Sequence, residues 1–167
     1  MIGLKMILKN NHVFDGAFLL NRPPDNFNKG HWLTVDPGDN TAVCHWYDGR
    51  MGFIFTYKDC IKSMQSVHLT CFSKIIIENV ELWGGSSISY ASAASGDLFK
   101  LAMVVGALIY QFTKDSHCVY IVSPKKWKGQ LNQEQLQFIL KNKFNVIAKN
   151  EHEASAIGIG LWAAGKF

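Results

Sequence analysis

The segment Lys74–Ile77, followed at once by Glu78, restricts the possible folds of this chain more than any other feature. Its three consecutive isoleucines leave no polar face, which is typical of a short strand buried on both sides in a mainly parallel sheet. An acidic residue directly after such a strand lies at the carboxyl edge of the sheet, where open α/β sheets bind ligands. The sequence therefore predicts an α/β fold with a candidate site at Glu78.

A second strand that ends in an acid comes earlier in the chain. The strand pattern His31–Val35 is followed by Asp36, and Pro37-Gly38 is a turn signal. Two further β-rich segments and the hairpin signal between them predict an antiparallel meander: Thr41–Tyr47, Asp48-Gly49 and Met51–Tyr57.

The rest of the chain alternates between helix and strand patterns, so we expect a mixed sheet flanked by helices. The predicted elements are a helix at 58–72, a helix with an apolar stripe from Leu98 to Phe112, a strand at Cys118–Val122, a helix from the cap Asn132 to about Lys143, and a last helix from Glu151 to about Ala164. Residues 1–30 are expected to be an N-terminal extension, and residues 31–167 the functional domain.

Composition agrees with one globular domain. The chain has 167 residues, of which 48% are hydrophobic, and its net charge of +4 is compatible with an anionic partner. The four cysteines form no CxxC pair, so no zinc site is predicted. The sequence shows neither a signal-peptide pattern nor an apolar run of the ~20 residues that a membrane span requires. We expect a cytoplasmic chain in a bacterial or phage-infected cell, neither secreted nor membrane-bound.

Asp36 and Glu78 are the candidate metal ligands. If their strands are neighbours, the two carboxylates repel each other at neutral pH unless a cation lies between them. Hard oxygen ligands of this kind suit Mg²⁺ or Mn²⁺, which can activate water for phosphodiester hydrolysis. The alternative is that Asp36 only begins a turn and that Glu78 is a solvated strand end.

Four motifs, taken in order, resemble the RuvC family of Holliday-junction resolvases over roughly residues 31–164. They are Thr34-Val35-Asp36-Pro37-Gly38, Ile75-Ile76-Ile77-Glu78-Asn79-Val80, Leu98-Phe99-Lys100-Leu101 with Gly106, and the segment from His152 to Gly160. The resemblance implies a ribonuclease-H-like fold, Mg²⁺ or Mn²⁺ as cofactor, and a homodimer formed through the helix that begins near Leu98. It also implies a structure-selective endodeoxyribonuclease that resolves branched DNA.

The closing motif departs from the family at one position. The motif can be aligned with the family pattern in two registers. In the register that best fits its alternation of small and apolar residues, His152 takes the position of the third metal ligand, and Ser155 stands where the family has a carboxylate. Either the chain is a disabled form, or another acid substitutes, for which Glu151 is near enough in sequence. The other register puts Asn150 and Glu153 at these two positions. A further alternative for His152 is a surface histidine at the start of the helix.

Basic and aromatic residues supply the candidate DNA contacts. The resemblance implies a basic residue near the scissile phosphate, and Lys128 matches best, while Lys125 and Lys126 would contact other phosphates. Trp127 is expected to stack on a base or sugar, or alternatively to be buried beside a solvated basic loop. Trp83 matches the aromatic residue that the family inserts into the junction, or else anchors a Gly/Ser-rich loop.

Two other functions remain open at this point. One is a different ribonuclease-H-like nuclease, acting on RNA–DNA hybrids or in DNA packaging. The other is a non-catalytic module that binds branched DNA, because Ser155 replaces an expected carboxylate.

Overall fold

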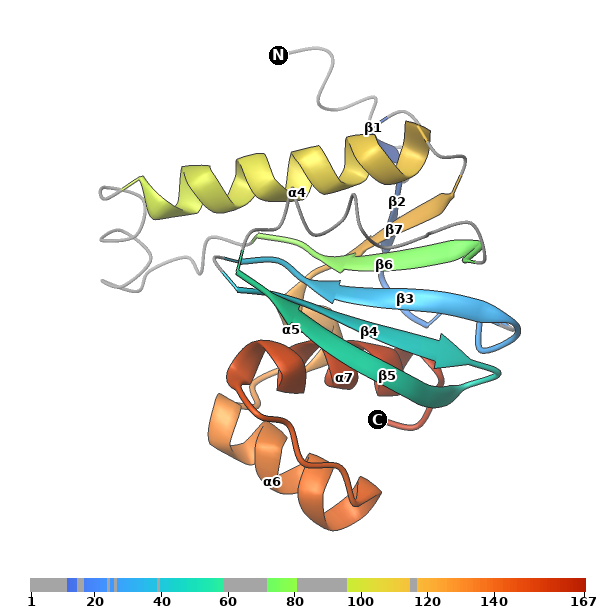
Figure 1. Ribbon diagram of the computed structural model, residues 1–167, viewed down its shortest axis with the longest axis vertical. Coiled ribbons are helices and arrows are strands. Elements are labelled where there is room, and N and C mark those ends of the chain that lie inside the picture. Colours follow the sequence, from blue (N-terminus) through green and yellow to red (C-terminus); the bar gives the residue numbers. More distant parts are fainter. Residues whose placement is uncertain are drawn as a thin grey trace.

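The computed structural model describes residues 12–14, 17–23, 25, 27–38, 40–58, 72–80, 96–114 and 117–167. They form a seven-stranded mixed sheet with helices on both faces (Figure 1). This confirms the predicted α/β fold. The body of the helix expected at 58–72, and the Gly/Ser-rich loop that contains Trp83, lie outside the described residues.

The sheet has the strand order β1-β2-β7-β6-β3-β4-β5. Its strands are β1 (His12–Phe14), β2 (Ala17–Leu20), β3 (His31–Asp36), β4 (Thr41–Tyr47), β5 (Arg50–Tyr57), β6 (Lys74–Glu78) and β7 (Cys118–Val122). β3, β4 and β5 form the predicted antiparallel meander, whereas β6 is parallel to both β3 and β7. The two strands that end in acids are therefore direct neighbours.

The expected N-terminal extension contributes to this sheet. β2 runs parallel to β7, in a register that pairs Ala17 with Val119 and Leu20 with Val122. Further along, the ring of Phe27 packs edge-on against Trp32, with 5.2 Å between ring centroids. The sheet thus includes residues on both sides of the expected division at residue 30.

In the described part of the chain, helices lie on both faces of the sheet (Figure 1). They are α4 (Asp97–Lys114) on the first face, and α5 (Pro124–Trp127), α6 (Gln133–Phe144) and α7 (Glu151–Ala163) on the second. α6 begins at the predicted cap, where the Asn132 side chain accepts from the Gln135 amide and the Gln135 side chain accepts from the Asn132 amide. Within the described residues, no helix has both the length and the apolar character needed to cross a bilayer.

Alternation along β3 and β6 divides the core into two clusters. Leu33, Val35 and Ile77 pack with α4, while Trp32 and Ile76 pack with α7. Asp36 and Glu78 continue the second series, so both acids face the side of the sheet that α7 covers.

α7 packs closely against β4 and α5 because small residues line it. A Cβ atom on Gly160 would come within 2.0 Å of the Trp46 ring, and one on Gly158 within 2.4 Å of the Trp127 ring. The Trp46 indole N–H donates to Thr34 Oγ1 at 3.0 Å, and the Thr34 hydroxyl donates to the carbonyl of Ala156 at 2.7 Å. These contacts explain the small/apolar alternation of the closing motif.

Candidate metal centre and nucleic-acid surface

Asp36 and Glu78 lie side by side at the carboxyl edge of the sheet. Val35 pairs with Ile77 in the parallel register of β3 and β6, so the next residue of each strand is an acid at the same level. Both side chains are buried, with 7% of Asp36 and 8% of Glu78 exposed. Burial, then the charge of Asp36 and a hydrogen bond to it, raise the pKa of Glu78 to about 8. Without a cation, the protonated form of Glu78 is therefore favoured at neutral pH.

Trp127 forms a hydrogen bond with Glu78 on the face of the sheet that α7 covers. Its indole Nε1–H donates to Glu78 Oε1 at 3.0 Å, and only 3% of Trp127 is exposed. The expectation that Trp127 stacks on DNA is therefore wrong, and the buried alternative is correct. The physical reason is Gly158, which leaves space in α7 for the indole ring.

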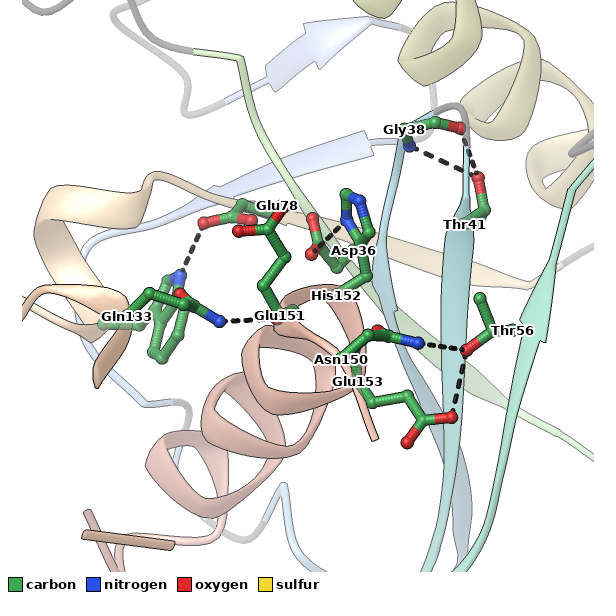
Figure 2. A network of polar contacts seen from close by, with 11 residues as sticks. Asp36, Gly38, Thr41, Thr56, Glu78, Gln133, Asn150, Glu151, His152 and Glu153 are labelled. Carbon is green, nitrogen blue, oxygen red and sulfur yellow. Dashed lines mark hydrogen bonds and ion pairs between the residues drawn. The ribbon is translucent and has the colours of Figure 1, made fainter. Parts of the chain in front are cut away.

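His152 approaches Asp36 from the first turn of α7. Its Nδ1 atom lies 3.1 Å from Asp36 Oδ2, and Figure 2 shows the imidazole beside this carboxylate. A Cβ atom on Gly38 would come within 3.0 Å of His152 Cε1, so the Asp-Pro-Gly turn leaves the room that the imidazole needs. His152 is thus a partner of Asp36 rather than an isolated surface histidine.

Glu153 does not join this pair of acids. Its carboxylate accepts from the Thr56 hydroxyl at 3.1 Å and from the Lys149 amide at 2.8 Å, and Figure 2 shows it directed toward Thr56. Successive residues of a helix point in different directions, so His152 and Glu153 cannot both face Asp36. The structure therefore does not bring the Glu153 carboxylate to Asp36 and Glu78. Of the two residues, His152 is the one that contacts Asp36.

Glu151 directly precedes His152 in α7, and its side chain lies on the side of the helix that faces the candidate site. Figure 2 shows its side chain extending from the first turn of the helix toward Glu78. Its backbone carbonyl accepts from Gln133 Nε2 at 2.7 Å, which ties this turn to α6. Ser155 is buried one turn further along α7. Of these two residues, Glu151 is thus the one whose side chain extends toward the candidate site (Figure 2).

The donor set fits a hard divalent cation. Asp36 and Glu78 offer carboxylate oxygens, the ligands that Mg²⁺ and Mn²⁺ prefer, and a cation would offset both the burial and the Asp36 charge that raise the pKa of Glu78. In the part of the chain that the structure describes, no three His, Cys, Asp or Glu side chains are already grouped so that they could hold a metal ion. Asp36 and Glu78 are thus the two central residues of the candidate metal site. A third metal ligand would have to move toward them.

One lysine, Lys128, lies at the same edge of the sheet. A cavity of about 230 Å³ is lined by Asp36, Glu78 and Lys128, together with residues of α4 such as Leu98 and Leu101. Lys128 lies over the Trp127 ring, with its Nζ 5.3 Å from the centroid, and its charge lowers the pKa of Glu78 in part. Lys125 and Lys126 are exposed on α5. The structure thus brings Lys128 to the acids and leaves the other two lysines at the surface.

Solved structures with the same fold exist. The chain matches Thermus thermophilus RuvC in complex with a Holliday junction substrate at 13% identity and a TM-score of 0.55, over 78% of this chain and 90% of that one. It matches a second Thermus thermophilus RuvC structure at 14% identity and a TM-score of 0.53, over 78% of this chain and 91% of that one. No protein-family model matches the sequence, and the search of curated proteins found no match. The fold is therefore the ribonuclease-H-like α/β fold of the RuvC structures.

Proposed function

We propose that this protein is a structure-selective endodeoxyribonuclease that resolves branched DNA, Holliday junctions in particular, by divalent-metal-assisted hydrolysis of phosphodiester bonds. One observation carries the proposal: Asp36 and Glu78 end neighbouring parallel strands, side by side, at the carboxyl edge of a RuvC-like sheet. Such an edge is where α/β sheets bind ligands, and buried paired carboxylates are costly unless a cation compensates them.

In this proposal Asp36 and Glu78 hold Mg²⁺ or Mn²⁺. When bound, the metal supplies Lewis-acid chemistry for attack by water on phosphorus. His152 orients Asp36 through the 3.1 Å contact, and Lys128 stabilises the negative charge that develops on the phosphate. Lys125 and Lys126 attract neighbouring phosphates from the exposed face of α5.

In this proposal Glu151 supplies the third carboxylate of the metal site, beside Asp36 and Glu78, in place of Ser155. Two divalent cations, as used in many phosphoryl-transfer sites, bring more positive charge than Asp36 and Glu78 alone can balance. The exposed Glu151 side chain extends toward Glu78, and inward movement would add the missing carboxylate (Figure 2). Ser155 is the observation that favours the second candidate function, a module that binds branched DNA without cutting it.

We further propose a homodimer formed through α4. Val105, Leu108 and Ile109 bury one stripe of this helix against the sheet. On its other side three large apolar side chains are highly exposed: Phe99 at 70%, Met103 at 62% and Tyr110 at 69%. A two-fold dimer would present two sites to opposite strands of a two-fold symmetric junction.

Comparing substrates tests the proposal. With Mg²⁺ or Mn²⁺, we expect the wild-type chain to nick a labelled four-way junction in preference to a linear duplex of the same sequence. An RNA–DNA hybrid serves as the third substrate. Cleavage of the hybrid alone would instead indicate a ribonuclease H, and junction binding without any cleavage would support the non-catalytic module.

A further inference from the structure

We infer that Trp127 is a positioning residue of the candidate metal centre, whose indole fixes the carboxylate of Glu78 for cation binding. The inference rests on the proposed function, because it concerns the same site. It starts from the 3.0 Å hydrogen bond that the Trp127 indole N–H donates to Glu78 Oε1. Both partners are buried, so little water competes for this bond.

The indole is itself held in place on several sides. Trp127 ends α5, directly before Lys128, whose Nζ lies over its ring. Gly158 of α7 leaves the space for the ring edge, since a Cβ atom there would come within 2.4 Å of Trp127 Cζ3. Phe167 contacts the ring, with 6.2 Å between centroids. A donor held this firmly defines the position of the oxygen that accepts from it.

This arrangement restricts Glu78 in a way that serves metal binding. A glutamate has three side-chain torsions, and a strand end alone does not fix the outer ones. With Oε1 bound to the indole, the carboxylate is held in one orientation beside Asp36, leaving its remaining lone pairs for a cation. Hydrogen bonds that orient ligating carboxylates typically change metal affinity by about 10- to 100-fold when they are removed.

Trp46 is a matched control for Trp127. It is also buried, donates its indole N–H to a polar side chain, Thr34 Oγ1, at 3.0 Å, and occupies the space left by a glycine of α7, Gly160. Its hydrogen bond does not involve Asp36 or Glu78. Replacing Trp46 therefore reproduces the structural cost of losing a buried indole without altering the candidate ligands.

The experiment compares Mn²⁺ affinity, measured by calorimetry on the metal-free full chain, for the wild type, Trp127→Phe and Trp46→Phe. We expect Trp127→Phe to weaken Mn²⁺ binding by about 10-fold or more, as for other residues that orient metal ligands, and Trp46→Phe to leave it unchanged. Equal Mn²⁺ affinity in Trp127→Phe and the wild type would overturn the inference while leaving the metal site intact. A wild type that binds no Mn²⁺ would overturn the proposed function, and the inference with it.

A second measurement needs no replacement of tryptophan. In ¹⁵N-labelled wild-type chain, Mg²⁺ should shift the indole N–H resonance of Trp127, because its acceptor becomes a metal ligand, and should leave that of Trp46 in place. Glu78→Gln should abolish the shift. If Mg²⁺ binds and the Trp127 resonance does not move, Trp127 does not hold the ligand, whatever the stability of its variants.

Discussion

His152 Nδ1 lies 3.1 Å from Asp36 Oδ2, which joins the first turn of α7 to the end of β3 across 116 positions of sequence. Nδ1 is the ring nitrogen that faces Asp36, so this contact does not involve Nε2. The contact brings the closing motif to the strand-end acids. The candidate site is therefore built from β3, β6 and α7 together.

Glu78 should make the stability of the metal-free chain depend on pH. Its folded pKa of about 8 lies above the ordinary value of 4.5, so the folded state retains a proton that the unfolded state releases. The contribution of this proton to the free energy of unfolding is therefore present in full below pH 4.5, and it is lost as the pH rises toward 8.

Glu78→Gln carries no such proton and should gain stability relative to the wild type across that range. Each 1 kcal/mol corresponds to a Tm difference of about 2–4 °C in a chain of this size. Thermal unfolding in a chelating buffer at several pH values measures the difference. A Tm gap that stays constant with pH would contradict the assigned pKa. Added Mg²⁺ should stabilise the wild type and have little effect on Glu78→Gln.

In the proposed site, Glu151 and Ser155 determine whether a third carboxylate is available beside Asp36 and Glu78. We expect Glu151→Gln to weaken Mn²⁺ binding and slow junction cleavage, because the substitute carboxylate is lost. Ser155→Asp should raise cleavage in Mg²⁺ by about tenfold or more, which corresponds to ~1.4 kcal/mol of transition-state stabilisation.

Glu153→Gln is the matched control for Glu151→Gln, one position further along α7. Glu153 is bonded to Thr56 and to the Lys149 amide, so its replacement should leave Mn²⁺ affinity unchanged. Loss of metal binding in Glu153→Gln with none in Glu151→Gln would show that the other register is the functional one.

The exposed lysines of α5 should contribute to DNA affinity through phosphate charge. Replacing Lys125 and Lys126 by Ala should weaken binding to junction and duplex alike. The slope of log affinity against log salt should fall by about 0.9 per lost phosphate contact. The control pair is Lys141→Ala with Lys143→Ala, which removes the same charge from the last turn of α6. Equal salt slopes for the two double variants would show that DNA does not contact Lys125 and Lys126.

The exposed apolar side of α4 should determine the oligomeric state. We expect sedimentation to show a dimer of the wild type at micromolar concentration and a monomer of Met103→Glu. Met103 is exposed, so its replacement should not affect folding of the single chain. Phe138→Glu, at a similarly exposed site on α6, should remain a dimer. A monomeric wild type would argue directly against the α4 interface.

The strands β3 to β7 and the longer described helices could be predicted because their signals are local. The isoleucine run of β6, the Asp-Pro-Gly end of β3 and the Asn132 cap of α6 each identify an element from adjacent residues. Because both strand ends can be recognised in the sequence, the prediction that Asp36 and Glu78 form a pair required only that β3 and β6 be neighbours.

Features that depend on distant residues could not be predicted in the same way. The burial of Trp127 depends on Gly158, and nothing around the Lys-Lys-Trp-Lys segment indicates that glycine. α5 has only four residues, too few to show a helical period. β2 is equally short, and its place beside β7 is a long-range pairing. The partners of Glu151 and Glu153 likewise follow from how α7 is rotated against the sheet.

Cleavage and binding of the same four-way junction by Asp36→Asn test the central claim most directly. Cleavage of labelled junction in Mg²⁺ and binding in a chelating buffer are measured on one preparation each of the wild type and the variant. Removing the charge of Asp36 should abolish cleavage and leave junction affinity equal or slightly higher, because a repulsion toward phosphate is lost. Junction cleavage at the wild-type rate by Asp36→Asn would contradict the assignment of a metal centre to the ends of β3 and β6.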